Sequence, residues 1–146
     1  MKRVHFIGIG GTGISAMALM LLERGYQVSG SDTSDSAYFQ KVTERGARTI
    51  IGHDPALALQ ADVVVRSSAI KDDDPEVQAA KAAGIPVLKR AEMLPEVTAD
   101  KQTIAIAGSH GKTTTTAMLV TLMTSFDLDP SFILGAEIKD LHTNAH

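Results

Sequence analysis

Short apolar runs recur along the chain and are separated by longer segments that end at glycine. Such runs, rich in Val and Ile, are typical of strands buried on both faces of a sheet. Strands that alternate with helices indicate a parallel sheet. We therefore expect an α/β protein with a Rossmann-like, mostly parallel sheet and helices on both faces. The predicted strands are Val4–Ile7, Tyr26–Gly30, Arg48–Ile51, Asp62–Val65 and Ile85–Leu88.

The segments between these runs have the composition and end signals of helices. Gly25, Gly46 and Gly84 each follow such a segment, and glycine is the commonest residue just beyond a helix end. The acidic run at 72–74 precedes Pro75, which suits a helix start better than a metal site. The predicted helices are 14–24, 37–45, 75–83 and 91–97.

A polar connection at 98–101 predicts a domain boundary. Residues 1–98 would form a complete domain, and residues 99–146 the start of a second one. This second unit begins with a predicted strand at 103–107, a loop at 108–112 and a helix at 113–126, with a further short strand at 132–134. Strand, loop and helix in this order are the opening of a P-loop ATP-binding domain.

Composition excludes several classes of function. The net charge of −3 offers no basic surface for nucleic acid, and the absence of cysteine excludes disulfides and thiolate metal sites. Lys2-Arg3 followed by an apolar stretch to Leu22 resembles an export signal or membrane span. The glycines between positions 8 and 13 weaken a helix there, so a strand, a turn and a buried helix are favoured, and no membrane insertion is expected.

The first candidate site is the loop Gly8-Ile9-Gly10-Gly11-Thr12-Gly13, which fits G-x-G-x-x-G between a predicted strand and a predicted helix. Residues without Cβ let the backbone approach a diphosphate, whose charge the helix N-terminus stabilises. Asp32, at the end of the next strand, is placed to accept a hydrogen bond from a ribose hydroxyl. The pattern does not separate a dinucleotide such as NAD from a UDP-sugar, and the glycines alone also permit tight packing.

The second candidate site is the loop Gly108-Ser109-His110-Gly111-Lys112-Thr113, which opens a helix after an apolar run. Lys112 would neutralise the β- and γ-phosphates of ATP, the Thr113 hydroxyl would bind Mg²⁺, and loop N–H groups would line the phosphates. Ile106 stands where the general P-loop pattern requires its first glycine. The role of His110 stays open between phosphate donor and turn former.

Together the two loops and three further segments resemble the Mur ligase family. The resemblance rests on residues 6–13, 29–32, 67–70, 90–94 and 107–116, in family order, and includes the family's own shortened ATP loop. Within the family, 67–70 and 90–94 favour the ligases that add L-alanine over those that recycle a murein tripeptide.

The resemblance implies a cytoplasmic, ATP- and Mg²⁺-dependent ligase that joins L-alanine to UDP-N-acetylmuramate through an acyl phosphate, in peptidoglycan precursor synthesis. Members continue for a few hundred residues more, so this chain alone is expected to be inactive, and its unpaired edges to favour self-association. The residues implied for the UDP-sugar are Gly10, Gly11, Thr12, Gly13, Ser31, Asp32, Ser67 and Ser68. Those implied for ATP and Mg²⁺ are Gly108, Ser109, His110, Gly111, Lys112, Thr113 and Thr114, with Lys112 and Thr113 catalytic and Thr113 the Mg²⁺ ligand.

Two other functions are compatible with the residues. A NAD(P)-type dinucleotide-binding domain would use the first loop alone, and a UDP-sugar sensor would bind the sugar nucleotide without ATP. Ligand selectivity distinguishes these readings, because a ligand stabilises only the state that it binds.

Overall fold

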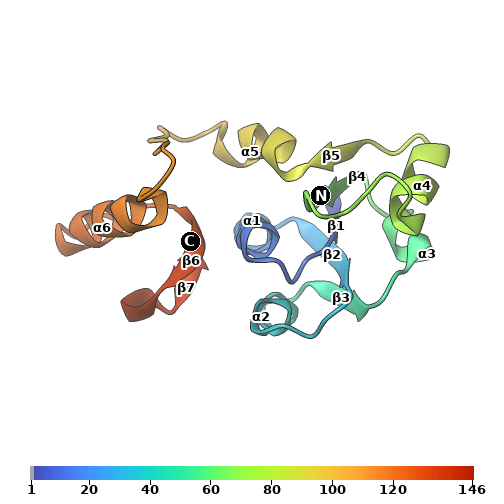
Figure 1. Ribbon diagram of the computed structural model, residues 1–146, viewed down its shortest axis with the longest axis horizontal. Coiled ribbons are helices and arrows are strands. Elements are labelled where there is room, and N and C mark those ends of the chain that lie inside the picture. The colour runs from blue at the N-terminus through green and yellow to red at the C-terminus, as the bar shows by residue number, and fades with distance from the viewer. Residues whose placement is uncertain (1) are drawn as a thin grey trace.

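A five-stranded parallel sheet forms the centre of the protein, as the computed structural model, which describes residues 2–146, shows in Figure 1. The strand order is β3-β2-β1-β4-β5, and each neighbouring pair is parallel. The strands are β1 Arg3–Ile7, β2 Gln27–Asp32, β3 Arg48–Ile51, β4 Val63–Arg66 and β5 Val87–Lys89. The predicted fold class and all five predicted strands of this sheet are thereby confirmed.

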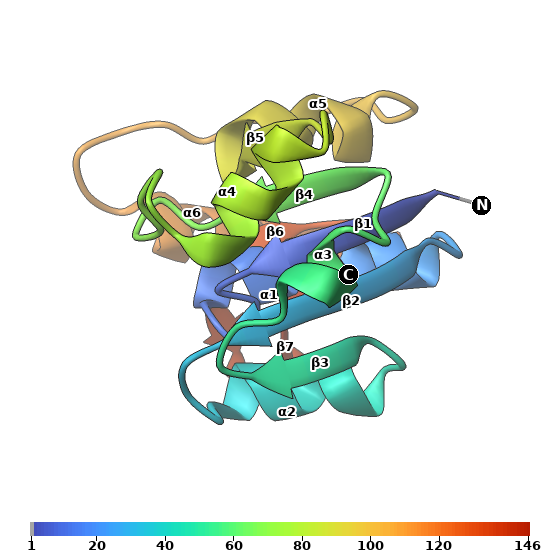
Figure 2. The ribbon, with the colours of Figure 1, turned by 90° about the vertical axis from the view of Figure 1, so that its right-hand side faces the viewer.

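Helices cover both faces of the sheet. Figures 1 and 2 show α1, α2 and α5 on one face, and α3 and α4 on the other. Their bounds are α1 Thr12–Glu23, α2 Ala37–Glu44, α3 Pro55–Ala58, α4 Pro75–Ala82 and α5 Arg90–Thr98. The short α3 was not expected from the sequence; Asp54 caps it through the Leu57 amide, and Pro55 starts it. Across residues 2–146, every helix falls short of the length and apolar character that a membrane span needs.

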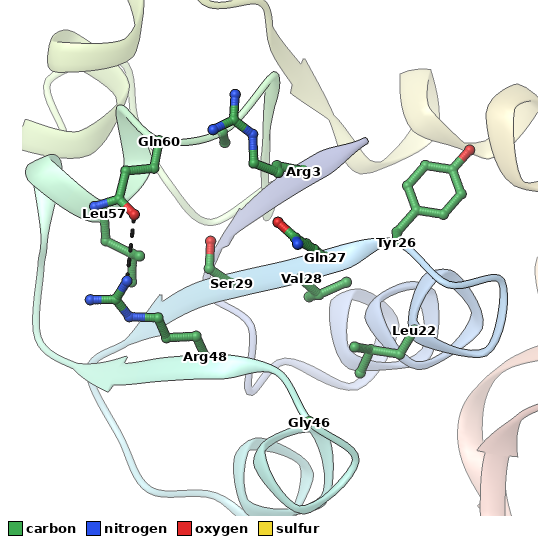
Figure 3. A pocket seen from close by; sticks show the side chains of 11 residues that line it. Arg3, Leu22, Tyr26, Gln27, Val28, Ser29, Gly46, Arg48, Leu57 and Gln60 are labelled. Carbon is green, nitrogen blue, oxygen red and sulfur yellow. Dashed lines mark hydrogen bonds between the residues drawn. The ribbon is translucent and has the colours of Figure 1, made fainter. Parts of the chain in front are cut away.

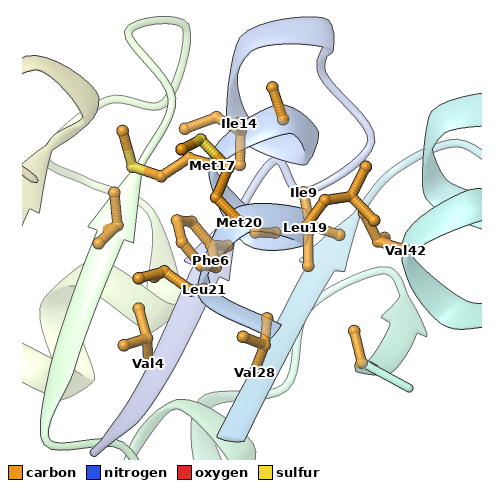
Figure 4. Close-up of a cluster of buried hydrophobic side chains, with 14 of the residues drawn as sticks. Val4, Phe6, Ile9, Ile14, Met17, Leu19, Met20, Leu21, Val28 and Val42 are labelled. Atoms are coloured by element: carbon orange, nitrogen blue, oxygen red, sulfur yellow. The ribbon is translucent and has the colours of Figure 1, made fainter. Parts of the chain in front are cut away.

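The largest apolar core lies between α1 and the sheet (Figure 4). Successive residues of a strand point to opposite faces, and Val4 and Phe6 of β1 therefore point toward α1 together with Val28 of β2. α1 is apolar enough to be buried along most of its length, which explains the apolar stretch near the N-terminus. Burial of α1 against the sheet fixes its orientation, and with it the direction in which its N-terminus points.

The remaining chain forms α6 Lys112–Ser125 and a small antiparallel pair, β6 Ile133–Ile138 and β7 Thr143–Ala145, joined by the 3-10 turn η1 Lys139–Leu141. This pair packs against α1. The helix and the strand near position 133 were expected. The predicted strand at 103–107 was wrong: this segment belongs to neither sheet, because no described strand lies beside it to complete its hydrogen bonds.

α6 is largely uncovered. Only Val120 of its residues is buried, where it packs with Phe132, Leu134 and Ile138. An apolar stripe on its outer side consists of Met118, Leu122 and Phe126, which are 68%, 54% and 70% exposed. The sheet and its covering helices thus share a closed core, to which Ala145 of β7 also contributes, whereas α6 presents an open apolar face.

Gly30 should be essential for this fold. A Cβ at this position would stand 2.6 Å from the Phe6 carbonyl oxygen and 2.6 Å from Ile9 Cδ1. We expect Gly30→Ala to lower the free energy of unfolding by about 1–3 kcal/mol, as overpacking does, measured by urea denaturation. Gly135→Ala is the matched control, because the only atom near its Cβ would be Thr113 Oγ1 at 3.7 Å. Equal stability of the two variants would contradict the argument.

Candidate functional site

The glycine loop between β1 and α1 is held against the end of β2 by backbone hydrogen bonds. Gly8 N and Ile9 N both donate to the Ser31 carbonyl oxygen, at 2.8 and 3.0 Å, and Gly11 N donates to Gly8 O at 3.1 Å. Gly8 has a φ of +80°, which only glycine adopts readily. The loop therefore turns sharply at the carboxyl end of the sheet and enters α1 directly.

The start of α1 has the features of an anion site. Gly11 is the N-cap and provides no side chain, and the first turn contains no acidic residue. The first N–H groups of a helix lack partners within the helix and carry its partial positive charge. Gly11 is exposed and Thr12 and Gly13 are half-buried, so a ligand can reach these three predicted residues, whereas Gly10 is buried.

Asp32 is already engaged within the protein. Its Oδ2 accepts from Gly10 N at 2.8 Å, and its Oδ1 accepts from Ser34 N at 3.1 Å. A Cβ on Gly10 would stand 3.0 Å from that Oδ2 and 2.8 Å from Ser36 Oγ. Asp32 thus holds the middle of the glycine loop, and Gly10 is required because nothing larger fits between Asp32 and Ser36.

Ser31 lies on the far side of the sheet from the loop opening. Its side chain is 1% exposed, and its hydroxyl donates to Glu76 Oε2 at 2.5 Å. Only its carbonyl group reaches the glycine loop. The structure therefore places the Ser31 side chain beneath the loop, where it supports the loop and lies away from the space above it. Alternation along β2 explains this, because Gly30 and Ser31 must face opposite sides.

Glu76, at the start of α4, is the centre of a buried polar cluster. Its Oε1 accepts from Asp54 N at 3.0 Å and lies 3.2 Å from His5 Nε2, while Oε2 binds Ser31 and lies 3.3 Å from His53 Nδ1. Burial by itself would raise the pKa of Glu76, but the hydrogen bonds from His5, Ser31 and Asp54 outweigh it and lower the pKa to about 2.

His53, Asp74 and Glu76 bring three potential metal-ligand atoms within 4.8 Å of one another. Two features of the site weigh against a cation. Asp74 is the N-cap of α4, and the positive end of a helix repels cations. Both Glu76 oxygens already have hydrogen-bond partners. Tying α4 and the β3–α3 loop to β1 and β2 accounts for the cluster without a metal.

Ser67 and Ser68 follow β4 and line a pocket of about 400 Å³ at the same edge of the sheet as the glycine loop. Ser67 adjoins that loop: a Cβ on Gly8 would stand 3.1 Å from Ser67 Cβ. Lys71 and Lys89 also line the pocket, so it is suited to a polar or anionic group. The structure thus brings Ser67, the glycine loop and Asp32 to one end of the sheet.

The second predicted site lies open on the surface. Gly111 caps α6 with a φ of +78°, and Lys112 begins the helix. The Lys112 ammonium donates to the carbonyl oxygens of Gly108 and Ser109, at 2.6 and 3.3 Å. The predicted residues from Gly108 to Thr114 are all exposed, and the His110 ring makes no hydrogen bond with any of residues 2–146.

Two residues near α1 were missed by the sequence analysis. Asn144 of β7 is fully buried and donates through Nδ2 to Thr12 O at 2.8 Å, while its Oδ1 has no hydrogen-bond partner among the described residues. Arg90, the first residue of α5, lies against Gly13: a Cβ there would stand 2.9 Å from Arg90 Nη1. Both come from distant segments, and only Arg90 had a signal, its place in the segment 90–94.

A further pocket of about 360 Å³ lies at the amino ends of the strands (Figure 3). Its polar lining includes Arg3, Gln27 and Arg48, and Arg3 is paired with Asp62 at 2.7 Å. None of the predicted site residues lines it. The candidate site is therefore at the opposite, carboxyl edge of the sheet, where ligands of open α/β sheets bind.

The family match and the similar proteins found by comparison point to the same family. Residues 3–102 match the family described as "Mur ligase family, catalytic domain". The UDP-N-acetylmuramate–L-alanine ligase of Aquifex aeolicus is 50% identical over 144 residues, which is 99% of this chain and 32% of that protein. The chain thus spans about a third of the length of such curated relatives.

Two solved structures are similar over almost the whole chain. The UDP-N-acetylmuramate-alanine ligase of Thermotoga maritima has a TM-score of 0.93 and 29% identity, over 100% of this chain and 35% of its own. The UDP-N-acetylmuramate:L-alanyl-gamma-D-glutamyl-meso-diaminopimelate ligase of Neisseria meningitides has a TM-score of 0.91 and 32% identity, over 99% and 46%.

The Glu76 cluster makes a prediction about stability and pH. The pKa of Glu76 is about 2 in the folded protein against an ordinary value of 4.5, so the charged carboxylate stabilises the fold above about pH 4.5. That contribution is lost as the pH falls from 4.5 toward 2. We expect Glu76→Gln to lower the free energy of unfolding by about 3 kcal/mol at pH 7, with the difference from wild type shrinking below pH 4.5.

Urea denaturation across this pH range measures the difference. Asp62→Asn is the control: the hydrogen bond from Arg3 lowers the pKa of Asp62 to about 2 as well, but that pair is exposed. Exposed pairs contribute little to stability, so this variant should stay close to wild type. A Glu76→Gln deficit that is constant with pH would contradict the linkage.

Proposed function

Because the chain belongs to the Mur ligase family, we propose that it is the UDP-sugar-binding part of an ATP-dependent ligase that joins L-alanine to UDP-N-acetylmuramate. The observation that carries the choice of substrate is the 50% identity to a UDP-N-acetylmuramate–L-alanine ligase across 99% of the chain. The solved structures do not separate the two ligases, since this chain is 29% identical to the alanine ligase of Thermotoga maritima and 32% identical to the tripeptide-adding ligase.

The UDP group would bind at the carboxyl end of the sheet. The diphosphate would lie at the start of α1, against the backbone of Gly10 to Gly13, where the free N–H groups of Thr12 and Gly13 and the helix dipole stabilise negative charge. Asp32 would hold the loop through Gly10 N, and Ser67 and Ser68 would line the neighbouring pocket. Ser31 would act through its carbonyl oxygen, as the support of Gly8 and Ile9.

ATP would bind at the loop from Gly108 to Thr114, with Mg²⁺ bound to the Thr113 hydroxyl. The sugar's carboxylate would attack the γ-phosphorus, forming an acyl phosphate and releasing ADP. The amine of L-alanine would then attack the acyl carbon, form the amide and release inorganic phosphate. A carboxylate is a poor acyl donor, so phosphorylation is needed, and Lys112 would neutralise charge on the transferred phosphoryl group.

Lys112 is suited to this role by its present contacts. Its ammonium binds carbonyl oxygens of its own loop and makes no ion pair with a carboxylate among residues 2–146. It is therefore held over the loop in an exposed position, and phosphate oxygens would replace the two carbonyl groups.

We further propose that the protein works in the cytoplasm, where ATP is available. We also propose that the isolated chain associates with itself through the apolar stripe Met118, Leu122 and Phe126.

Ligand selectivity tests the proposed substrate. We expect UDP-N-acetylmuramate at about 100 times its Kd to stabilise the chain by about 2.7 kcal/mol, and UDP to stabilise it less. NAD and NADP should give no shift in Tm, measured by thermal denaturation. Stabilisation by NAD, with none by UDP-N-acetylmuramate, would replace the ligase with a dinucleotide-binding domain. Stabilisation by the UDP-sugar, with no binding of ATP to the chain, would be compatible with a sensor module.

The isolated chain should not catalyse the proposed ligase reaction. The proposed reaction needs ATP, the sugar carboxylate and the amine in one closed site, whereas residues Gly108 to Thr114 are all exposed in this chain. We expect no phosphate release beyond background with ATP, Mg²⁺, UDP-N-acetylmuramate and L-alanine, while the full-length Aquifex aeolicus ligase serves as the positive control. Repeated turnovers by the 146-residue chain would show that the site is complete without further sequence.

A further inference from the structure

Arg90 begins α5 at the carboxyl end of β5 and reaches across to the first turn of α1. The contact with Gly13 is close: a Cβ at Gly13 would stand 2.9 Å from Arg90 Nη1, 3.2 Å from Cζ and 3.3 Å from Cδ. α5 packs beside α1, as Figures 1 and 2 show. The absence of a side chain at Gly13 is therefore what lets the guanidinium lie on the glycine loop.

The position of Arg90 is unfavourable for α5 itself. A cation in the first turn of a helix faces the positive end of the helix dipole, and acidic residues are preferred there. Arg90 obtains no compensation inside the protein, because within residues 2–146 its side chain makes no ion pair and no hydrogen bond; the nearby Glu92 side chain binds Lys89 N at 2.6 Å. The guanidinium also lies against Gly13 in the first turn of α1, whose N-cap makes no side-chain hydrogen bond, so a second positive helix end is close to it. The positive ends of two helices and the unpaired guanidinium would together stabilise an anion.

A second observation at the same turn points to a ligand. Asn144 is fully buried and its Nδ2 is fixed by Thr12 O, so its Oδ1 is held beside the first turn of α1 without a donor. A buried acceptor without a partner costs about 1–3 kcal/mol. A sugar diphosphate carries both missing partners, since it has phosphate oxygens for a cation and hydroxyl or amide groups that donate.

We propose that Arg90 is a binding residue for the diphosphate of the UDP-sugar, and that Gly13 is required chiefly to let its guanidinium reach that position. This inference rests on the proposed function and names a residue of the same site. The planar guanidinium can donate two parallel hydrogen bonds to phosphate oxygens from the side, while the first amides of α1 donate along the helix axis. Arg90 would thereby hold the diphosphate against the loop.

Isothermal titration of the 146-residue chain with UDP-N-acetylmuramate, UDP and uridine tests the proposal. Arg90→Gln should weaken binding of both diphosphates about tenfold to a hundredfold, as expected for loss of hydrogen bonds to a charged group. The affinity of Arg90→Lys should lie between those of wild type and Arg90→Gln, because lysine keeps the charge but lacks the planar guanidinium. Uridine, which has no phosphate, should bind all variants equally. A purely structural role of Arg90 would change uridine binding as well.

Gly13→Ala provides a second, independent variant, since its Cβ would displace the guanidinium. It should weaken diphosphate binding, and combination with Arg90→Gln should add little to the effect of either change alone. Arg45→Gln is the matched control: it removes the same charge from the exposed end of α2 and should leave every Kd unchanged. Circular dichroism and Tm verify that each variant is folded.

The possible failures can be distinguished. If wild type binds UDP-N-acetylmuramate and Arg90→Gln binds it equally well, the role of Arg90 is refuted and the proposed function stands. If wild type binds neither UDP-N-acetylmuramate nor UDP, the proposed function is refuted and the role of Arg90 with it. If Arg90→Gln and Arg45→Gln lose affinity equally, the effect is one of net charge, and the proposal fails.

Discussion

The close approach of β1, the glycine loop and β2 is the constraint on which the site depends. Gly30 pairs with Phe6 across the two strands and leaves the space that Ile9 fills, so the loop can turn back over the end of β2. The Ser31 carbonyl oxygen then binds two successive loop amides. Through these contacts the sheet sets where α1 begins and where its free amides point. The position of the helix end that we propose as an anion site is thus a consequence of strand packing.

The two faces of the sheet contribute differently to this arrangement. Toward α1 the sheet is apolar, and burial of Val4, Phe6 and Val28 supplies a nondirectional driving force. Toward α4 it carries the His5, Ser31 and Glu76 cluster, whose hydrogen bonds are directional. Removal of one member of such a cluster is costly, but the cluster as a whole is a poor source of net stability compared with apolar packing. The cluster instead fixes the position of α4, because it ties this helix to the end of β2 that holds the glycine loop.

The sequence predicted the secondary structure of residues 2–98 well because its signals are local. Apolar runs identified all five strands, and the glycines after α1, α2 and α4, together with the acidic run before Pro75, located the ends of these helices. The strand expected at 103–107 failed because a strand needs a neighbour, and pairing is not visible in a single run of residues. The orientation of the Ser31 hydroxyl follows from alternation along β2, once the face of Gly30 is known. Arg90 and Asn144 could not be placed, since each meets the first turn of α1 only through tertiary packing.

The two glycine-containing loops, 8–13 and 108–113, differ in how many contacts with the rest of the chain hold them in place. The glycine loop is bound by the ends of β2 and β4 and by α5, and Asp32 fixes its centre, so little ordering would accompany binding there. The second loop has extended chain before it and a largely exposed helix after it, and Lys112 is held only by carbonyl oxygens of the same loop. A ligand at the second loop would have to bear more of the ordering cost itself. A glycine loop that enters a helix is therefore held in place where a sheet surrounds it, and stays open where no sheet does.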